Sequence, residues 1–170
     1  MSNFIVSITL PFLLFGLFDM DWESVDRKIA NDFPNVEDIS AGDLHQLYLK
    51  KTIELTLIID VRTENEFKVS HLSGALNLET AKEISQLISD KEANIVVYCS
   101  VGYRSAAVAD ELIKLDYKNV KNLHHSIFEW ASKDYPLSNK HGDTDKVHPF
   151  NKKWGKLLDE SLHEYSIGKP

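Results

Sequence analysis

From residue 36 onward, short apolar runs alternate along the chain with amphipathic segments. The apolar runs predict strands, and two of them have the β-branched, uninterrupted character of strands buried on both faces. The amphipathic segments carry apolar residues three and four positions apart, which predicts helices. The predicted strands cover 55–61, 75–78, 94–98 and 120–123. The predicted helices cover 40–48, 80–88, 105–115 and 128–132.

This alternation predicts an α/β fold with a mainly parallel sheet and helices on both faces. Capping-box patterns at Ser40 and Thr80 support the starts of the first two helices. Right-handed crossovers place every strand-to-helix loop at the carboxyl edge of such a sheet, where ligands bind in open α/β folds. The loops after Val61, Leu78 and Tyr98 are therefore the places to look for a site.

An uncharged apolar run occupies residues 4–18. As a helix it would cover about 22 Å, which is short of the roughly 30 Å hydrocarbon core of a bilayer. Its length favours an export signal or a short anchor, although no Lys or Arg precedes it and no A-x-A cleavage pattern follows. We therefore separate 1–20 as a segment that contacts a membrane, and we expect an exported or membrane-anchored protein rather than a cytoplasmic one. The alternative is a terminal segment packed on the domain.

Length and charge narrow the function classes. A chain of 170 residues suits one domain with short extensions. Its 26 acidic residues outnumber its 19 basic ones, and the net charge of −7 argues against nucleic acid as a partner, because that affinity comes from Lys and Arg. The single cysteine excludes an internal disulfide and any zinc site built from cysteines.

That cysteine, Cys99, lies between a predicted buried strand and a predicted helix. A thiol at this point faces the unpaired N–H groups of the first helical turn, which favour the reactive thiolate. Gly102 lets the loop curl so that its amides point inward, and Arg104 adds a fixed positive charge. The alternative is a small apolar residue buried at a strand end. The glycine and the arginine favour catalysis.

At these residues the sequence resembles the rhodanese-like sulfurtransferases. Residues 59–67 and 71–77 are similar to the first signature of that family, and 97–105 resemble its active-site loop. The segments 128–130 and 135–137 resemble its closing segment.

The resemblance covers about 36–137, one rhodanese-like domain with about five mainly parallel strands flanked by helices. It implies that Cys99 carries sulfane sulfur as a persulfide, taken from a donor such as thiosulfate or a persulfide. The acceptor would be a thiol, cyanide or a protein. We expect no cofactor and no resident metal. The predicted substrate-binding loop consists of Ser100, Val101, Gly102, Tyr103 and Arg104.

Several positions depart from the family pattern. Ser70 replaces a glycine, and His125 and Ser126 replace a glycine-rich turn. Arg104 is the only basic residue of the active loop. This argues against thiosulfate as the preferred donor, but it does not argue against sulfur transfer. Four residues separate Cys99 from Arg104. In phosphatases and arsenate reductases of this fold, the corresponding loop resembles a Cys-x5-Arg pattern, in which five residues separate the two. The shorter loop argues against phosphatase activity.

The remaining polar residues near the predicted edge carry weaker signals. Asp60 and Arg62 could orient substrate, but a structural ion pair is favoured. Ser105 is a supporting residue, and Glu66 and His71 are interpreted as scaffold.

Two further features concern possible sites elsewhere. The adjacent histidines His124 and His125 would point to opposite faces of a strand, which argues against a shared metal. In the C-terminal extension, 138–170, the apolar residues between 150 and 158 have helix-like spacing and are expected to pack on the domain. The alternative is a docking surface that uses Lys152, Lys153 and Lys156.

Two functions stay open: a single-domain sulfurtransferase, and a non-catalytic binding module at a membrane.

Overall fold

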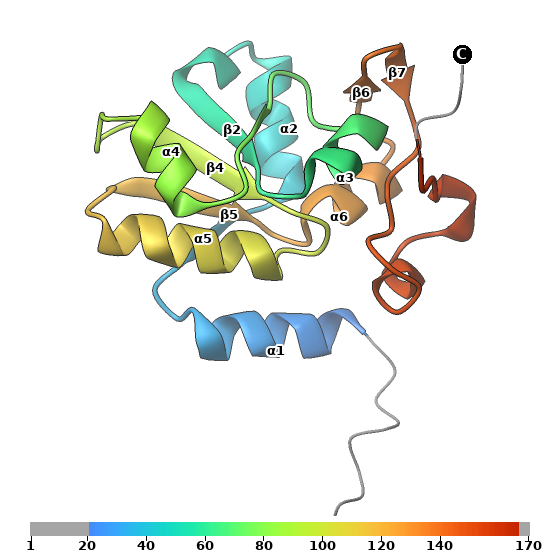
Figure 1. Ribbon diagram of the computed structural model, residues 1–170, viewed down its shortest axis with the longest axis horizontal. Coiled ribbons are helices and arrows are strands. Elements are labelled where there is room, and N and C mark those ends of the chain that lie inside the picture. Colours follow the sequence, from blue (N-terminus) through green and yellow to red (C-terminus); the bar gives the residue numbers. More distant parts are fainter. Residues whose placement is uncertain (1–20, 167–170) are drawn as a thin grey trace, which may run out of the picture.

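Five parallel strands form the central sheet, in the order β1-β5-β4-β2-β3. The computed structural model describes residues 21–166 (Figure 1). The strands are β1 (Glu37–Ile39), β2 (Thr56–Asp60), β3 (Leu76–Asn77), β4 (Asn94–Tyr98) and β5 (Asn119–Leu123). The predicted α/β fold is confirmed, and each predicted strand is present within one or two residues of its expected bounds.

Helices cover both faces of this sheet. They are α2 (Ala41–Leu49), α3 (Glu64–Val69), α4 (Ala81–Leu87), α5 (Tyr103–Lys114) and α6 (Ser126–Ser132). One core cluster joins Leu44 of α2 and Phe128 of α6 to the sheet, and a second joins Ile84 of α4 and Leu112 of α5 to it. Successive strand residues alternate between the two clusters, as a strand buried on both faces requires.

Side-chain caps fix where the helices begin. Ser40 and Thr80 are the N-caps of α2 and α4, as predicted, and Thr80 closes a full capping box with Glu83. Two helices begin two residues earlier than the apolar pattern indicates. The chain turns through a left-handed residue directly before each of them: Gly102 (φ 104°) before α5 and His125 (φ 52°) before α6.

A helix that the sequence pattern did not predict precedes the sheet. Asp21 is the N-cap of helix α1 (Trp22–Asp32), and its side chain accepts the N–H of Ser24 at 2.8 Å. Its buried residues Val25 and Ile29 belong to the first core cluster, and the helix packs against α5 (Figure 1). The folded unit therefore begins before residue 36.

The C-terminal extension packs on the domain. Strands β6 (Leu137–Asn139) and β7 (Gly142–Thr144) form an antiparallel hairpin, and Val147 and Leu158 are buried in the first core cluster. The helix-like spacing from 150 to 158 produces only one 3₁₀ turn, Trp154–Leu157. Phe150 is left-handed (φ 63°) and Leu158 is extended, so the chain leaves helical geometry on both sides of that turn.

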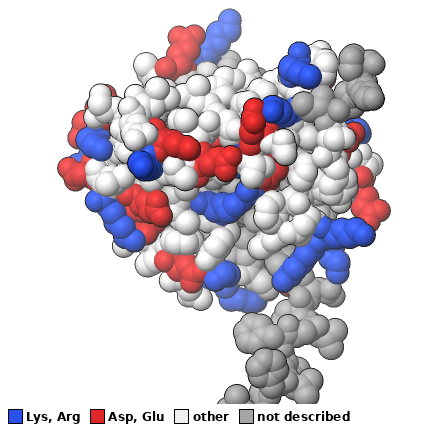
Figure 2. All heavy atoms as spheres, viewed as in Figure 1, with Lys and Arg blue, Asp and Glu red and all other residues white. Residues whose placement is uncertain are grey.

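The predicted membrane segment, 4–18, lies outside the described residues, so its insertion stays a prediction. Between residues 21 and 166, no helix combines the length and the apolar character needed to cross a bilayer. On the face shown in Figure 2, acidic and basic side chains are intermixed over most of the surface.

Candidate active site

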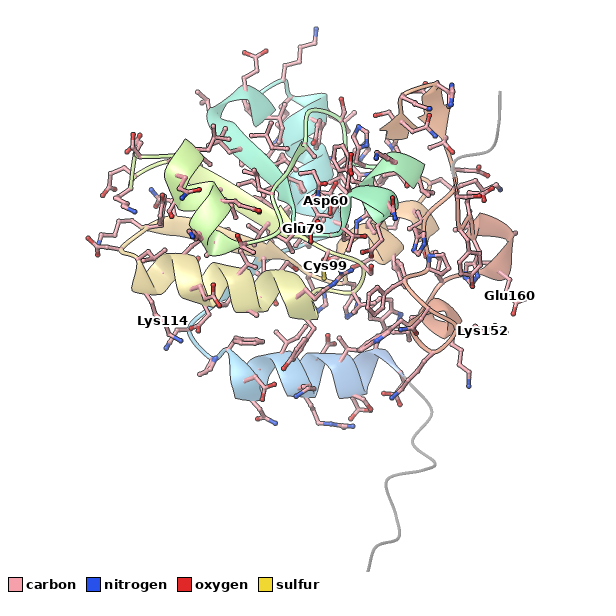
Figure 3. All side chains as sticks on the ribbon, in the orientation of Figure 1. Asp60, Glu79, Cys99, Lys114, Lys152 and Glu160 are labelled. Atoms are coloured by element: carbon pink, nitrogen blue, oxygen red, sulfur yellow. The ribbon has the colours of Figure 1, made fainter. Side chains whose placement is uncertain are left out.

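Cys99 lies at the carboxyl end of β4, between that strand and α5 (Figure 3). Its side chain is 1% exposed, and its Sγ accepts the backbone N–H of Gly102 at 3.2 Å. The backbone N–H of Cys99 donates to Ser126 Oγ at 3.1 Å. The sulfur is therefore held by its own loop, and the backbone of Cys99 is held by Ser126, the first residue of α6.

Gly102 makes the loop curl. Its φ of 104° lies in the left-handed region that favours glycine, and it is the N-cap residue of the 12-residue helix α5. This conformation turns the Gly102 N–H back towards Cys99, and the backbone N–H of Ser105 in the first turn of α5 also acts on the sulfur. Two backbone amides therefore face the Cys99 sulfur.

The surroundings of Cys99 favour its thiolate. Burial raises the pKa of the thiol, but the charge of Arg104 and hydrogen bonds from Ser105 and the Gly102 amide outweigh burial, so the pKa lies below its usual value. The Ser105 hydroxyl also lies 2.6 Å from Asn122 Oδ1, to which it donates. A hydroxyl has one proton, so we attribute the lowered pKa chiefly to Arg104 and the amides.

The guanidinium of Arg104 is held by the buried carboxylate of Glu66. Its Nη1 and Nη2 donate to Glu66 Oε2 and Oε1 at 3.0 and 2.7 Å. Burial alone raises the pKa of Glu66, but the bonds and charge of Arg104 lower it to about 2. Thr63 and Ser100 also donate to the Glu66 carboxylate. Glu66, interpreted as scaffold from the sequence, thus fixes the cation of the active loop.

Asp60 and Arg62 form a separate, fully buried ion pair. Both side chains have 0% exposure, and Arg62 Nη2 lies 2.6 Å from Asp60 Oδ2. The same Nη2 also donates to the carbonyl oxygen of Ser70 at 2.6 Å. Because the two side chains bind each other and the backbone, the ion pair favoured from the sequence is the arrangement present.

The turn between β5 and α6 corrects one prediction. His124 and His125 do not point to opposite faces of a strand, because β5 ends at Leu123 and His125 and Ser126 both adopt left-handed backbone (φ 52° and 49°). The two rings stack with centroids 3.7 Å apart. Left-handed backbone is the region that favours glycine, and here two residues other than glycine adopt it. Sequence reasoning missed the contact of Ser126 with Cys99.

The C-terminal extension reaches the active loop, which no local sequence signal indicates. The Phe150 ring lies over the Arg104 guanidinium, with 4.6 Å from Cζ to the ring centroid. Burial lowers the pKa of His148 below its usual value, and the charges of Glu66, Arg62 and Arg104 also act on it. Phe150 is 41% exposed, so the extension borders the site on its solvent side.

Comparison with known proteins assigns the family. A sequence model described as "Rhodanese-like domain" matches residues 40–133, more than half of the chain. The chain belongs to the rhodanese-like domain family. The match spans the loop that contains Cys99 and Arg104, so this cysteine environment lies within the rhodanese-like domain.

The relatives that this chain resembles are named for different activities. The chain is 35% identical over 116 residues to "Putative thiosulfate sulfurtransferase, mitochondrial" of Schizosaccharomyces pombe, covering 58% of this chain and 82% of the relative. It is 28% identical over 124 residues to the tRNA uridine(34) hydroxylase of Yersinia enterocolitica, covering 68% of this chain but only 35% of that enzyme. A rhodanese-related protein of Thermoplasma volcanium shares the fold, with a TM-score of 0.51, 24% identity, and coverage of 59% and 96% of the two chains.

The thiolate assignment makes a prediction about alkylation. We expect iodoacetamide to react with Cys99 with an apparent pKa below the usual value of about 8.5, because Arg104 and the amides stabilise the anion. Arg104→Gln should raise this apparent pKa, whereas Arg104→Lys should raise it less. Mass spectrometry of samples quenched between pH 5 and 10 measures the profile. An apparent pKa above 9 in the parent protein would identify a desolvated structural thiol instead.

Proposed function

We propose that this rhodanese-like domain is a sulfurtransferase that carries sulfane sulfur on Cys99. The observation that carries the proposal is the position of the Cys99 sulfur, which accepts the Gly102 N–H at the start of α5 and is stabilised as a thiolate by Arg104. A buried cysteine with a purely structural role needs neither feature. The sulfurtransferase named among the relatives also supports the proposal.

The transfer consists of two displacements. With thiosulfate as donor, the Cys99 thiolate attacks the outer sulfur, a new S–S bond forms, and the S–S bond of thiosulfate breaks as sulfite leaves with its electron pair. The product is a persulfide anion on Cys99, which the amides at the start of α5 stabilise. A thiolate or cyanide then attacks the terminal sulfur, takes it as a persulfide or thiocyanate, and restores the Cys99 thiolate.

The charges of the site affect the choice of donor. Arg104 stabilises the Cys99 thiolate and is also paired with Glu66, so this one cation faces two anions before a substrate arrives and offers little net positive charge to a dianion. Thiosulfate is a dianion, whereas a low-molecular-weight or protein persulfide brings less charge to the sulfur that is attacked. We therefore propose a persulfide as the preferred donor and thiosulfate as a usable one. The acceptor is a small thiol, cyanide or a protein thiol.

Intact mass spectrometry tests the first half-reaction. We expect incubation with thiosulfate to add one sulfur, about 32 Da, to the protein, and we expect cyanide to remove it because the terminal sulfur is electrophilic. The Cys99→Ser variant should gain no mass, while Ser85→Ala, which changes a half-buried hydroxyl on α4 away from the site, serves as a matched control and should behave as the parent. A parent protein that gains no sulfur from thiosulfate or from glutathione persulfide would contradict the proposal.

Membrane association is a separate matter. The prediction that 4–18 enters a membrane, and with it the exported or anchored location, rests on the apolar run alone. The alternative to catalysis is a non-catalytic binding module at a membrane. The stabilised thiolate favours catalysis over that alternative, because a binding surface has no use for a lowered thiol pKa.

A further inference from the structure

A second cluster of chemically reactive side chains lies where α1 meets the turn after β5. It consists of Asp26 on α1 with His124 and His125, and their ligand atoms all lie within 4.8 Å of one another. The Nε2 atoms of His124 and His125 approach the same Asp26 Oδ1, at 3.3 and 2.9 Å. Residues almost a hundred positions apart in sequence thus direct two nitrogens and one oxygen at one point.

The backbone of the turn produces this convergence. Because His125 is left-handed, its ring turns onto the same side as that of His124, and the two rings stack with an interplanar angle of 27°. The Trp22 ring stacks on His125 from the other direction, with centroids 3.9 Å apart. Packing therefore holds both Nε2 atoms close to Asp26, and a bound ion has only to turn the two rings apart so that both nitrogen lone pairs meet it.

A second carboxylate lies on the opposite side of the two rings. Glu129 Oε2 is 3.5 Å from His125 Nδ1 and 3.9 Å from His124 Nδ1, and this buried oxygen has no hydrogen-bond partner. A histidine that binds a metal through Nε2 usually donates its Nδ1–H to a carboxylate or carbonyl oxygen. The unpartnered Glu129 oxygen is placed where such a partner is needed.

We propose that Asp26, His124 and His125 bind a divalent transition-metal ion of the Zn²⁺ class. In a tetrahedral zinc site the edge between two ligand atoms is roughly 3.3 Å, given Zn–N and Zn–O bonds of about 2.0 to 2.1 Å. The separations of 3.3 and 2.9 Å between the Nε2 atoms and Asp26 Oδ1 are close to this edge. Two imidazoles with one carboxylate select Zn²⁺ or its neighbours over Mg²⁺ and Ca²⁺, which prefer oxygen ligands. Glu129 orients the rings, and water completes the coordination.

The ion would connect α1 to the turn that supports the active loop. Asp26 lies in the middle of α1, and Ser126, the residue after His125, accepts the backbone N–H of Cys99. A bound ion therefore adds a cross-link between α1 and the sheet, and the folded protein should become more stable as the ion concentration rises.

Metal titration of the full chain tests the proposal, with Cys99 replaced by Ser so that no thiolate competes for the ion. We expect isothermal titration with Zn²⁺ alone to show one ion per chain, and the melting temperature to rise with Zn²⁺. His124→Asn and Asp26→Asn should each weaken Zn²⁺ binding at least tenfold, because each removes one of three protein ligands. His141→Asn, at an exposed histidine in the β6–β7 turn, is the matched control and should bind as the parent.

A second readout keeps the result independent of any loss of folding. With Co²⁺ in place of Zn²⁺, the parent should show the visible absorption of a four-coordinate nitrogen and oxygen site, and His124→Asn should lose it at an unchanged metal-free melting temperature. His124 is suited to this test because its side chain is 37% exposed. If no ion binds at one per chain, or if His124→Asn and Asp26→Asn bind like the control, the cluster is only a hydrogen-bonded contact and the proposal is wrong.

Discussion

Gly102→Val should reduce sulfur transfer by at least about 100-fold, because misplacing a reacting group by about 1 Å costs that much. Gly102 has a φ of 104°, which a β-branched residue avoids, and its N–H donates to the Cys99 sulfur. A side chain there would also meet Ile29 Cδ1 at 3.4 Å and Asn122 Nδ2 at 3.6 Å. Steady-state assays with thiosulfate and cyanide measure the loss. Arg104→Lys, which keeps the charge but loses the two-pronged bond to Glu66, should cost less.

The matched control for Gly102→Val is Gly142→Val. Gly142 has a similar φ of 117°, is the first residue of β7, and has open space around it. The control imposes comparable backbone strain away from the active loop, so it should lower stability slightly and leave transfer unchanged. Full activity in Gly102→Val would show that the amide arrangement around Cys99 does not support the reaction.

Asp60→Ala should lower the free energy of unfolding by about 3 to 5 kcal/mol. The substitution leaves the Arg62 guanidinium fully buried without its counter-charge, and a buried uncompensated charge is among the most destabilising changes in a protein. Urea unfolding followed by far-UV circular dichroism measures the change. Because Arg62 Nη1 already lacks a hydrogen-bond partner, the double variant Asp60→Leu/Arg62→Met should recover part of the loss.

An exposed ion pair supplies the control for this effect. Glu64 and Lys68 pair on α3 with side chains 72% and 46% exposed, so Glu64→Ala should cost less than about 1 kcal/mol. Equal losses in Asp60→Ala and Glu64→Ala would mean that water reaches the buried pair and that burial does not determine its energetic importance.

Local sequence determined most of the fold. The β-branched runs of β2 and β4, with turn residues on each side, specify buried parallel strands, and Ser40 and Thr80 cap their helices through bonds that span only three residues. The position of Cys99 at the end of β4 and before α5 follows from the same local signals. The pattern of apolar residues did not predict helix α1, because the helix precedes the first strand and its two buried residues form only a narrow apolar stripe.

In the candidate site, too, sequence predicted what depends on neighbouring residues and missed the contacts between distant ones. Sequence placed Cys99, Gly102 and Arg104 on one loop, because they are close together in the chain. It could not show that Glu66 holds Arg104, that Ser126 holds the Cys99 amide, or that Phe150 covers the guanidinium. These contacts join residues 27 to 46 positions apart, so they depend on how the strands and the C-terminal extension pack together.

His124 and His125 show most clearly that local sequence rules do not predict contacts set by tertiary packing. Alternation along a strand predicted that His124 and His125 diverge, and this rule holds only while the backbone stays extended. The chain instead leaves β5 at Leu123 and enters left-handed geometry, which tertiary packing against Trp22 and the active loop imposes on residues other than glycine. Sequence by itself determined four strands of the central sheet, the caps of α2 and α4, and the position of Cys99 between a strand and a helix, because these depend on neighbouring residues. Only the tertiary structure decided which distant charges and rings surround them.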